Sequence, residues 1–222
     1  MAARLDGPRL APASGGPAKQ LVVFLHGYGA DGNDLIGLGS EWARVLPNAA
    51  FVSPHAPEPC GVAPTGRQWF NLTFRDATEI GRGVAQAAPV LSAFLDAELE
   101  RLRLPSRALA LVGFSQGTML ALAVGLRRNP ALAAIVGYSG ALASAEGLPE
   151  PGKGPAVLLV HGDMDEVIPV DAMMLAREQL AMAGLPVEWH VAPGVGHGID
   201  AEGLRLGAAF LKQAFAAATA VQ

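Results

Sequence analysis

The chain has 222 residues, a formal net charge of -4, a sequence pI of about 5.7, and 51% hydrophobic against 16% charged residues. This length suits one domain with a buried core, so we expect a single domain over residues 1–222, with 1–18 as a loosely ordered or edge segment. The chain is mildly acidic and has no run of Lys or Arg, so we expect no basic surface that would bind nucleic acid.

Cys60 is the one cysteine of the sequence, so no internal disulfide can form, which fits a reducing, cytoplasmic location. The first 20 residues lack the continuous apolar core of a signal peptide. The longest apolar stretch, 108–126, is interrupted by the polar and glycine-rich residues 113–118. We therefore expect no transmembrane segment.

Short apolar runs alternate along the chain with longer segments of helical periodicity. Strands are predicted at 21–25, 50–53, 109–113, 134–138, 156–160 and 187–191. Helices are predicted at 34–46, 84–103, 116–128, 171–183 and 201–218, the first of them capped by Asn33 or Asp34. This alternation predicts an α/β fold with a mostly parallel central sheet flanked by helices. The long irregular stretch 54–83 between the second strand and second helix is typical of a functional loop.

A G-x-S-x-G motif, Gly113-Phe114-Ser115-Gln116-Gly117, stands between a predicted strand and a predicted helix. In this position it indicates a nucleophile turn, in which the strand enters the helix so sharply that flanking side chains would clash. Ser115 would then be exposed beside a helix N-terminus, whose N–H groups can stabilise an oxyanion. The alternative is a glycine-rich turn with a capping serine.

The general base of such a serine is a histidine, and hydrolases with this turn place the serine, the acid and the histidine in that chain order. Two of the five histidines precede the serine. His161 closes a strand ahead of the acid candidates, and His190 lies inside the last predicted strand. His197 follows that strand in a glycine-rich loop, and we predict it as the base.

Three carboxylates, Asp163, Asp165 and Glu166, follow the strand that ends near His161. Their spacing alone does not decide among them, but the pattern Gly-x-x-Asp-x-x-Ile-Pro favours Asp165 and leaves Asp163 as a turn or capping residue. In the expected reaction His197 takes the Ser115 proton, protonates the leaving group, and later activates water, while Asp165 fixes the tautomer of His197.

The segment 27–32 formally matches the G-x-G-x-x-G fingerprint of a dinucleotide-binding turn, between a strand and a helix. No carboxylate stands at the end of the next strand, 50–53, which counts against nucleotide binding. A hydrolase would use the same turn to supply a backbone N–H to the oxyanion hole. The expected donors are the N–H groups of Tyr28 and Gln116.

Several motifs occur together in order along the chain from about residue 21. They are Leu25-His26-Gly27-Tyr28-Gly29, Pro54-His55-Ala56-Pro57, Trp69-Phe70, Gly113-Phe114-Ser115-Gln116-Gly117, His161-Gly162-Asp163-Met164-Asp165 and Gly196-His197. In these motifs the chain resembles the phospholipase/carboxylesterase family, which includes the acyl-protein thioesterases. Asn71 and Thr118 depart from it, since the family often has Asp and Gly there.

The resemblance implies an α/β-hydrolase fold without a large lid domain, and no metal or organic cofactor. It also implies a serine esterase for short- to medium-chain carboxylic esters or thioesters, with lysophospholipids or acylated proteins as alternative substrates. Trp69, Phe70 and Met164 would then bind substrate, although Trp69 fits a core aromatic equally well. A non-catalytic binding module of this fold is the remaining alternative. The apolar residues fit either a homodimer face or a lipid-facing rim, which the sequence does not distinguish.

Overall fold

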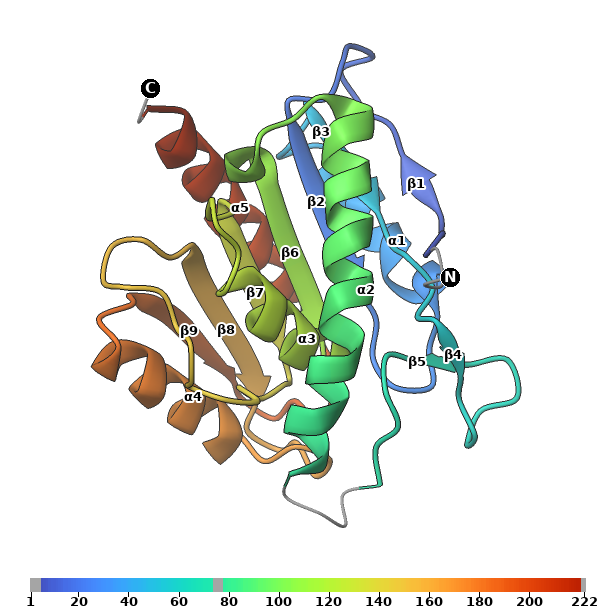
Figure 1. The fold of residues 1–222 in the computed structure, drawn as a ribbon, viewed down its shortest axis with the longest axis vertical. Coiled ribbons are helices and arrows are strands. Elements are labelled where there is room, and N and C mark those ends of the chain that lie inside the picture. The colour runs from blue at the N-terminus through green and yellow to red at the C-terminus, as the bar shows by residue number, and fades with distance from the viewer. Residues whose placement is uncertain (1–4, 74–77, 221–222) are drawn as a thin grey trace.

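The computed structural model describes residues 5–73 and 78–220 as a central sheet between two layers of helices (Figure 1). The seven-stranded sheet has the order β1-β3-β2-β6-β7-β8-β9, and every pair except β1–β3 is parallel. The strands are β1 (Arg9–Leu10), β2 (Gln20–Leu25), β3 (Ala49–Val52), β6 (Leu109–Phe114), β7 (Ala134–Tyr138), β8 (Ala156–Gly162) and β9 (Val187–Ala192). The expected mostly parallel sheet is therefore confirmed.

Each predicted helix is present, with shifted ends. The helices are α1 (Gly32–Trp42), α2 (Glu79–Leu102), α3 (Gln116–Gly125), α4 (Asp171–Met182) and α5 (Ala201–Ala220). The cap predicted at Asn33 or Asp34 is wrong. Asp31 caps α1, because its carboxylate accepts a hydrogen bond from the Asn33 N–H at 2.7 Å and so satisfies a donor of the first turn.

Three very short strands and one short helix were not predicted from the sequence. They are β1, the hairpin strands β4 (Glu58–Pro59) and β5 (Arg67–Gln68), and the 3-10 helix η1 (Ser106–Ala108). Two-residue strands carry no measurable periodicity, so the apolar pattern does not indicate them. The loop 54–83 contains the β4–β5 hairpin, and α2 begins within it at Glu79, five residues before the predicted start at 84.

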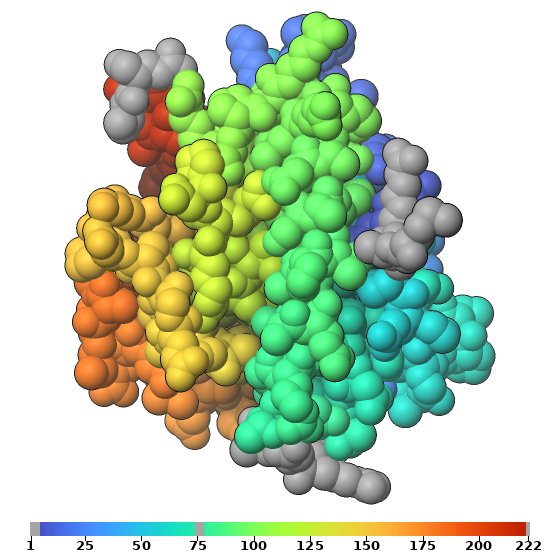
Figure 2. Space-filling model, in the orientation of Figure 1, coloured from blue at the N-terminus to red at the C-terminus, as the bar shows by residue number. Residues whose placement is uncertain are grey.

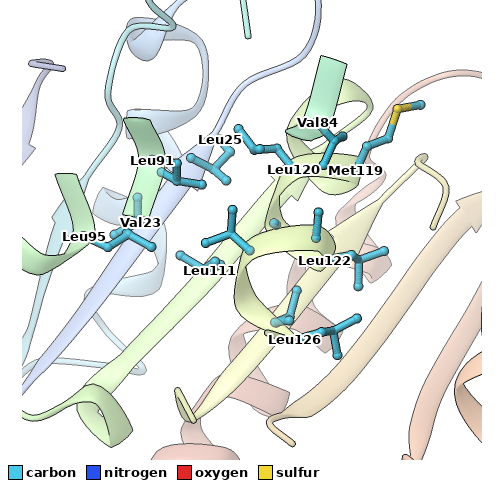
Figure 3. Close-up of a cluster of buried hydrophobic side chains, with 14 of the residues drawn as sticks. Val23, Leu25, Val84, Leu91, Leu95, Leu111, Met119, Leu120, Leu122 and Leu126 are labelled. Carbon is cyan, nitrogen blue, oxygen red and sulfur yellow. The ribbon is translucent and has the colours of Figure 1, made fainter. Parts of the chain in front are cut away.

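Helices cover both faces of the sheet. One apolar cluster joins the sheet to α2, α3 and α4, and a second joins it to α1 and α5. In Figure 2, α2 runs down the middle of the first face, with α4 at its margin. Figure 3 shows how the leucines of α3 pack against side chains of α2 and of strands β2 and β6. Among the described helices, none is both long and apolar enough to cross a membrane.

The parallel arrangement determines where functional residues gather. The carboxyl ends of β2, β6, β8 and β9 lie along one edge of the sheet, because these strands run in the same direction (Figure 1). Ligands of open α/β sheets bind outside this edge. The loops that carry Ser115, Asp165 and His197 all leave the sheet there.

Candidate active site

The chain makes a strained turn at Ser115, between the last residue of β6 and the first of α3. Ser115 has φ 53° and ψ -117°, a left-handed backbone that costs free energy in a residue other than glycine. A Cβ on Gly117 would lie 1.9 Å from the Leu25 carbonyl oxygen, and one on Gly113 would lie 2.5 Å from the Gly117 carbonyl carbon. The motif glycines are therefore required by the backbone packing around the serine.

Three predicted residues from distant parts of the chain form one hydrogen-bonded row. His197 Nε2 lies 3.0 Å from Ser115 Oγ, and His197 Nδ1 lies 2.8 Å from Asp165 Oδ2. A carboxylate only accepts, so Nδ1 carries the proton of the neutral ring and Nε2 is free to accept from the serine hydroxyl. The Asp165 side chain is fully buried, whereas that of His197 is 19% exposed to solvent.

Asp165 is held by donors on both of its oxygens. Its Oδ1 accepts from the N–H groups of Val167 and Ile168, each at 2.9 Å. Burial by itself raises the pKa of Asp165, but the hydrogen bonds from His197, Ile168 and Val167 outweigh it and hold the pKa below its ordinary value. The carboxylate therefore stays ionised and can stabilise a positive charge on His197.

The three carboxylates that spacing left open have different contacts in the structure. Asp163 Oδ1 accepts from the Gly194 N–H at 2.7 Å, which ties the loop after β8 to the loop that carries His197. Asp165 contacts His197 itself, and Glu166 is exposed. Asp163 therefore has the turn-stabilising position that the sequence offered as its alternative.

A histidine that was not predicted to belong to the site, His161, also contacts Asp165. His161 is 1% exposed, and its Nε2 lies 2.7 Å from the Ile168 carbonyl oxygen and 3.2 Å from Asp165 Oδ2. The available signal was its position at the carboxyl end of a strand, four residues before the acid. Periodicity cannot show that a strand-end side chain turns back towards a following loop.

The residues expected to bind substrate have different surroundings. Trp69 and Phe70 are each 2% exposed, and Met164 is 63% exposed on the loop that carries Asp165. The indole Nε1 of Trp69 donates to the His26 carbonyl at 3.0 Å. Both aromatic side chains are thus buried, and their contact with substrate stays a prediction.

Thr118, one of the departures from the family pattern, has a packing role. Its hydroxyl donates to the Tyr138 carbonyl at 2.8 Å, and a Cβ on Gly137 would lie 2.6 Å from the Thr118 methyl group. The threonine therefore fills the space above a glycine of β7. For Asn71 the structure offers no comparable explanation.

Two surface hollows lie away from the row of Ser115, His197 and Asp165. A groove of about 710 Å³ separates α1 from α5, and one of about 890 Å³ separates the N-terminal segment from α2. Within residues 5–73 and 78–220, no group of three or more histidine, cysteine or acidic side chains is arranged to hold a metal ion.

A parallel sheet with a strained serine turn after a central strand, and with the acid and histidine on later strand ends, defines the α/β-hydrolase class. Comparison with known proteins agrees. The family described as Phospholipase/Carboxylesterase matches residues 11–215, and the chain belongs to this family. That membership confirms the predicted fold and the expectation of a carboxylic ester hydrolase.

Individual relatives match this chain over most of their length. Esterase YpfH of Escherichia coli strain K12 is 32% identical over 189 residues, which cover 83% of this chain and 78% of that protein. Acyl-protein thioesterase 1 of Gibberella zeae is 27% identical over 230 residues, which cover 94% and 97%. The crystal structure of esterase PE8 is similar with a TM-score of 0.89 at 41% identity, over 95% of this chain and 99% of that chain.

Proposed function

We propose that the chain is a serine carboxylesterase that hydrolyses short- to medium-chain carboxylic esters or thioesters through an acyl-serine intermediate. The observation that carries this proposal is the row Ser115–His197–Asp165, with contacts of 3.0 and 2.8 Å. Catalytic groups within such distances can exchange a proton in a single step.

The geometry supports a two-stage reaction. Ser115 Oγ attacks the acyl carbon while its proton passes to His197 Nε2, and the imidazolium then protonates the leaving alcohol or thiol. A water molecule that gives its proton to the same nitrogen attacks the acyl-serine, and the carboxylic acid leaves as Ser115 regains its proton. Asp165 stays ionised throughout and stabilises the imidazolium in both stages.

Hydrolysis of thioesters on acylated proteins is a second candidate, because a relative named acyl-protein thioesterase matches nearly the whole chain. Hydrolysis of a lysophospholipid is a third candidate function, because the family description includes phospholipases. Exposed Met164 and Val167 flank the buried Asp165, and we propose that they contact the acyl chain or leaving group. We also propose a cytoplasmic location, which the single cysteine supports.

The structure gives a reason against the nucleotide-binding alternative. In a dinucleotide site the first N–H groups of the helix after the glycine turn bind a pyrophosphate. Here the Asp31 carboxylate occupies the Asn33 N–H and places a negative charge at that helix end. Both features oppose an anionic ligand.

The test is turnover of p-nitrophenyl esters of increasing chain length, beside thioesters with the same acyl groups. We expect wild type to be active and Ser115→Ala to lose a factor of about 10⁴–10⁶ in kcat. The ratio of ester to thioester turnover shows which of the two bonds the enzyme prefers, and turnover of an acylated protein tests the second candidate. Wild type that is inert towards all of these substrates and towards a fluorophosphonate probe would refute the proposal.

A further inference from the structure

The ring of His26 is buried at the end of β2, and both of its nitrogens contact the backbone. The residue has no exposed surface. Its Nε2 lies 3.1 Å from the Ala56 backbone nitrogen, and its Nδ1 lies 2.8 Å from the Gly27 carbonyl oxygen. The proposed reaction of Ser115, His197 and Asp165 assigns no step to His26.

These contacts determine where the ring carries its proton. The Ala56 N–H can only donate, so Nε2 must be unprotonated, and the Gly27 carbonyl can only accept, so Nδ1 must carry the hydrogen. A doubly protonated ring would direct an Nε2 hydrogen at the Ala56 N–H. Burial lowers the pKa of His26 and outweighs the opposing contribution of the Gly27 carbonyl, which keeps the ring neutral.

The Gly27 carbonyl belongs to the same planar peptide unit as the Tyr28 N–H, one of the two expected oxyanion donors. This turn lies against the nucleophile, since a Cβ on Gly27 would be 3.4 Å from Ser115 Cβ. A hydrogen bond that holds the carbonyl fixes the direction of the N–H on the opposite side of the peptide. It also polarises the peptide, which strengthens the N–H as a donor.

A second connection joins His26 to the other expected donor, Gln116. The His26 carbonyl accepts from Trp69 Nε1 at 3.0 Å. The Gln116 side chain accepts from the Trp69 N–H at 2.9 Å and donates to the Phe70 carbonyl at 2.8 Å. Buried hydrogen bonds thus link the side chain of Gln116, through Trp69 and His26, to the peptide that carries the Tyr28 N–H.

We propose that neutral His26, protonated at Nδ1, is a positioning residue that directs the Tyr28 N–H towards the oxyanion. The inference rests on the proposed function, because it assigns a role within the same site. Removing an oxyanion donor outright lowers kcat by about 10²–10³. A donor that is present but misdirected should cost less, about 10- to 100-fold in kcat.

Two substitutions separate the functions of the two ring nitrogens. The amide nitrogen of an asparagine stands close to the position of Nδ1 and can still donate to Gly27, whereas a glutamine amide reaches only the position of Nε2. We expect His26→Gln to lose about 10- to 100-fold in kcat with KM changed less than about twofold. His26→Asn should retain several times more activity than His26→Gln.

His55→Gln is the matched control. His55 Nδ1 accepts from the Gly32 N–H at 3.1 Å, so this variant also removes a histidine-to-backbone hydrogen bond from a neighbouring loop. We expect its kcat and KM to stay at the wild-type values. If His26→Gln does not fold, Trp69→Phe removes the donor to the His26 carbonyl and should lower kcat in the same direction.

Nitrogen-15 NMR of histidine-labelled wild type reports the His26 tautomer without any turnover. A proton on Nδ1 supports the proposal, and a proton on Nε2 overturns it. Wild-type kcat in His26→Gln, or equal losses in His26→Gln and His26→Asn accompanied by a raised KM, would also overturn it. Wild type that is inert towards every ester and towards the fluorophosphonate refutes the proposed function instead, which keeps the two failures distinguishable.

Discussion

His161 Nε2 lies 3.2 Å from Asp165 Oδ2, the same oxygen that accepts from His197. Because His161 Nε2 also lies 2.7 Å from the Ile168 carbonyl, it must carry a hydrogen, and that hydrogen is shared between the carbonyl and the carboxylate. The carboxylate therefore faces two imidazole donors, of which one contacts the serine. His161 thus contacts two residues, Asp165 and Ile168, of the loop between β8 and α4.

Replacing His161 should reduce the rate without weakening substrate binding. A hydrogen bond to a charged group contributes about 1.5–3 kcal/mol, so we expect His161→Phe to lower kcat about 10-fold or more. KM should stay near wild type, since His161 is buried away from solvent. His161→Gln keeps a donor near the Nε2 position and should recover part of the loss. Equal kcat in all three proteins would show that His161 has no positioning role.

The two aspartates of the loop after β8 should respond differently to the same substitution. Asp165→Asn leaves the fold in place but removes the charge that stabilises the imidazolium, and we expect kcat to fall about 10³- to 10⁴-fold. Asp163→Asn keeps an acceptor for the Gly194 N–H and should leave kcat within about threefold of wild type, because this hydrogen bond is to a backbone N–H and not to His197, and surface substitutions change stability by only about 0.5 kcal/mol. Steady-state kinetics with one ester measure kcat for both variants and for wild type. A larger loss at Asp163 would reverse the assignment of the acid.

Glu98 of α2 should contribute a pH-dependent part of the stability. Its side chain is 6% exposed and contacts Arg9 at 2.8 Å and Arg101 at 2.6 Å. Burial raises the pKa of Glu98, but the hydrogen bonds from the two arginines outweigh it, and the folded-state pKa lies below the usual 4.5. This contribution is therefore complete above the unfolded-state pKa and is lost as the pH falls through the lower folded-state value.

Glu98→Gln should accordingly reduce the free energy of unfolding by about 1–2 kcal/mol at pH 7. The difference from wild type should shrink as the pH falls below about 4.5. Urea unfolding at several pH values measures both effects. Glu100→Gln is the control, because Glu100 is exposed on the same helix and should change stability by less than about 0.5 kcal/mol. A constant difference between Glu98→Gln and wild type at all pH values would contradict the prediction.

Two glycine-to-alanine changes should have opposite effects on thermal unfolding. Gly37 is exposed inside α1, and a Cβ there would meet nothing within 4 Å, so Gly37→Ala should stabilise the protein by about 0.5–1 kcal/mol. Gly117→Ala would place a Cβ 1.9 Å from the Leu25 carbonyl, and we expect a loss of more than about 3 kcal/mol or no folded protein. A Gly117→Ala protein with wild-type stability and activity would show that the turn tolerates a side chain.

Local sequence was sufficient for the features that depend on neighbouring residues. The buried strands are continuous apolar runs, so their positions follow from composition, and the α/β alternation follows from their order. The glycines around Ser115 mark a sharp turn, and chain order together with a position in the loop after the last strand favoured His197 among five histidines. The family match and the similarity to a solved esterase structure confirm the predicted fold and the class of hydrolase.

Tertiary structure decided whatever depends on side chains meeting across strands. Asp163 and Asp165 are two residues apart, and only the path of the loop after β8 shows that Asp165 contacts His197 while Asp163 binds a backbone N–H. The contacts of His161 and His26 were also hidden from periodicity, because their partners lie in loops whose conformation is set by packing. The sequence determined which chemical groups are available, and the fold determined which of them lie within hydrogen-bonding distance.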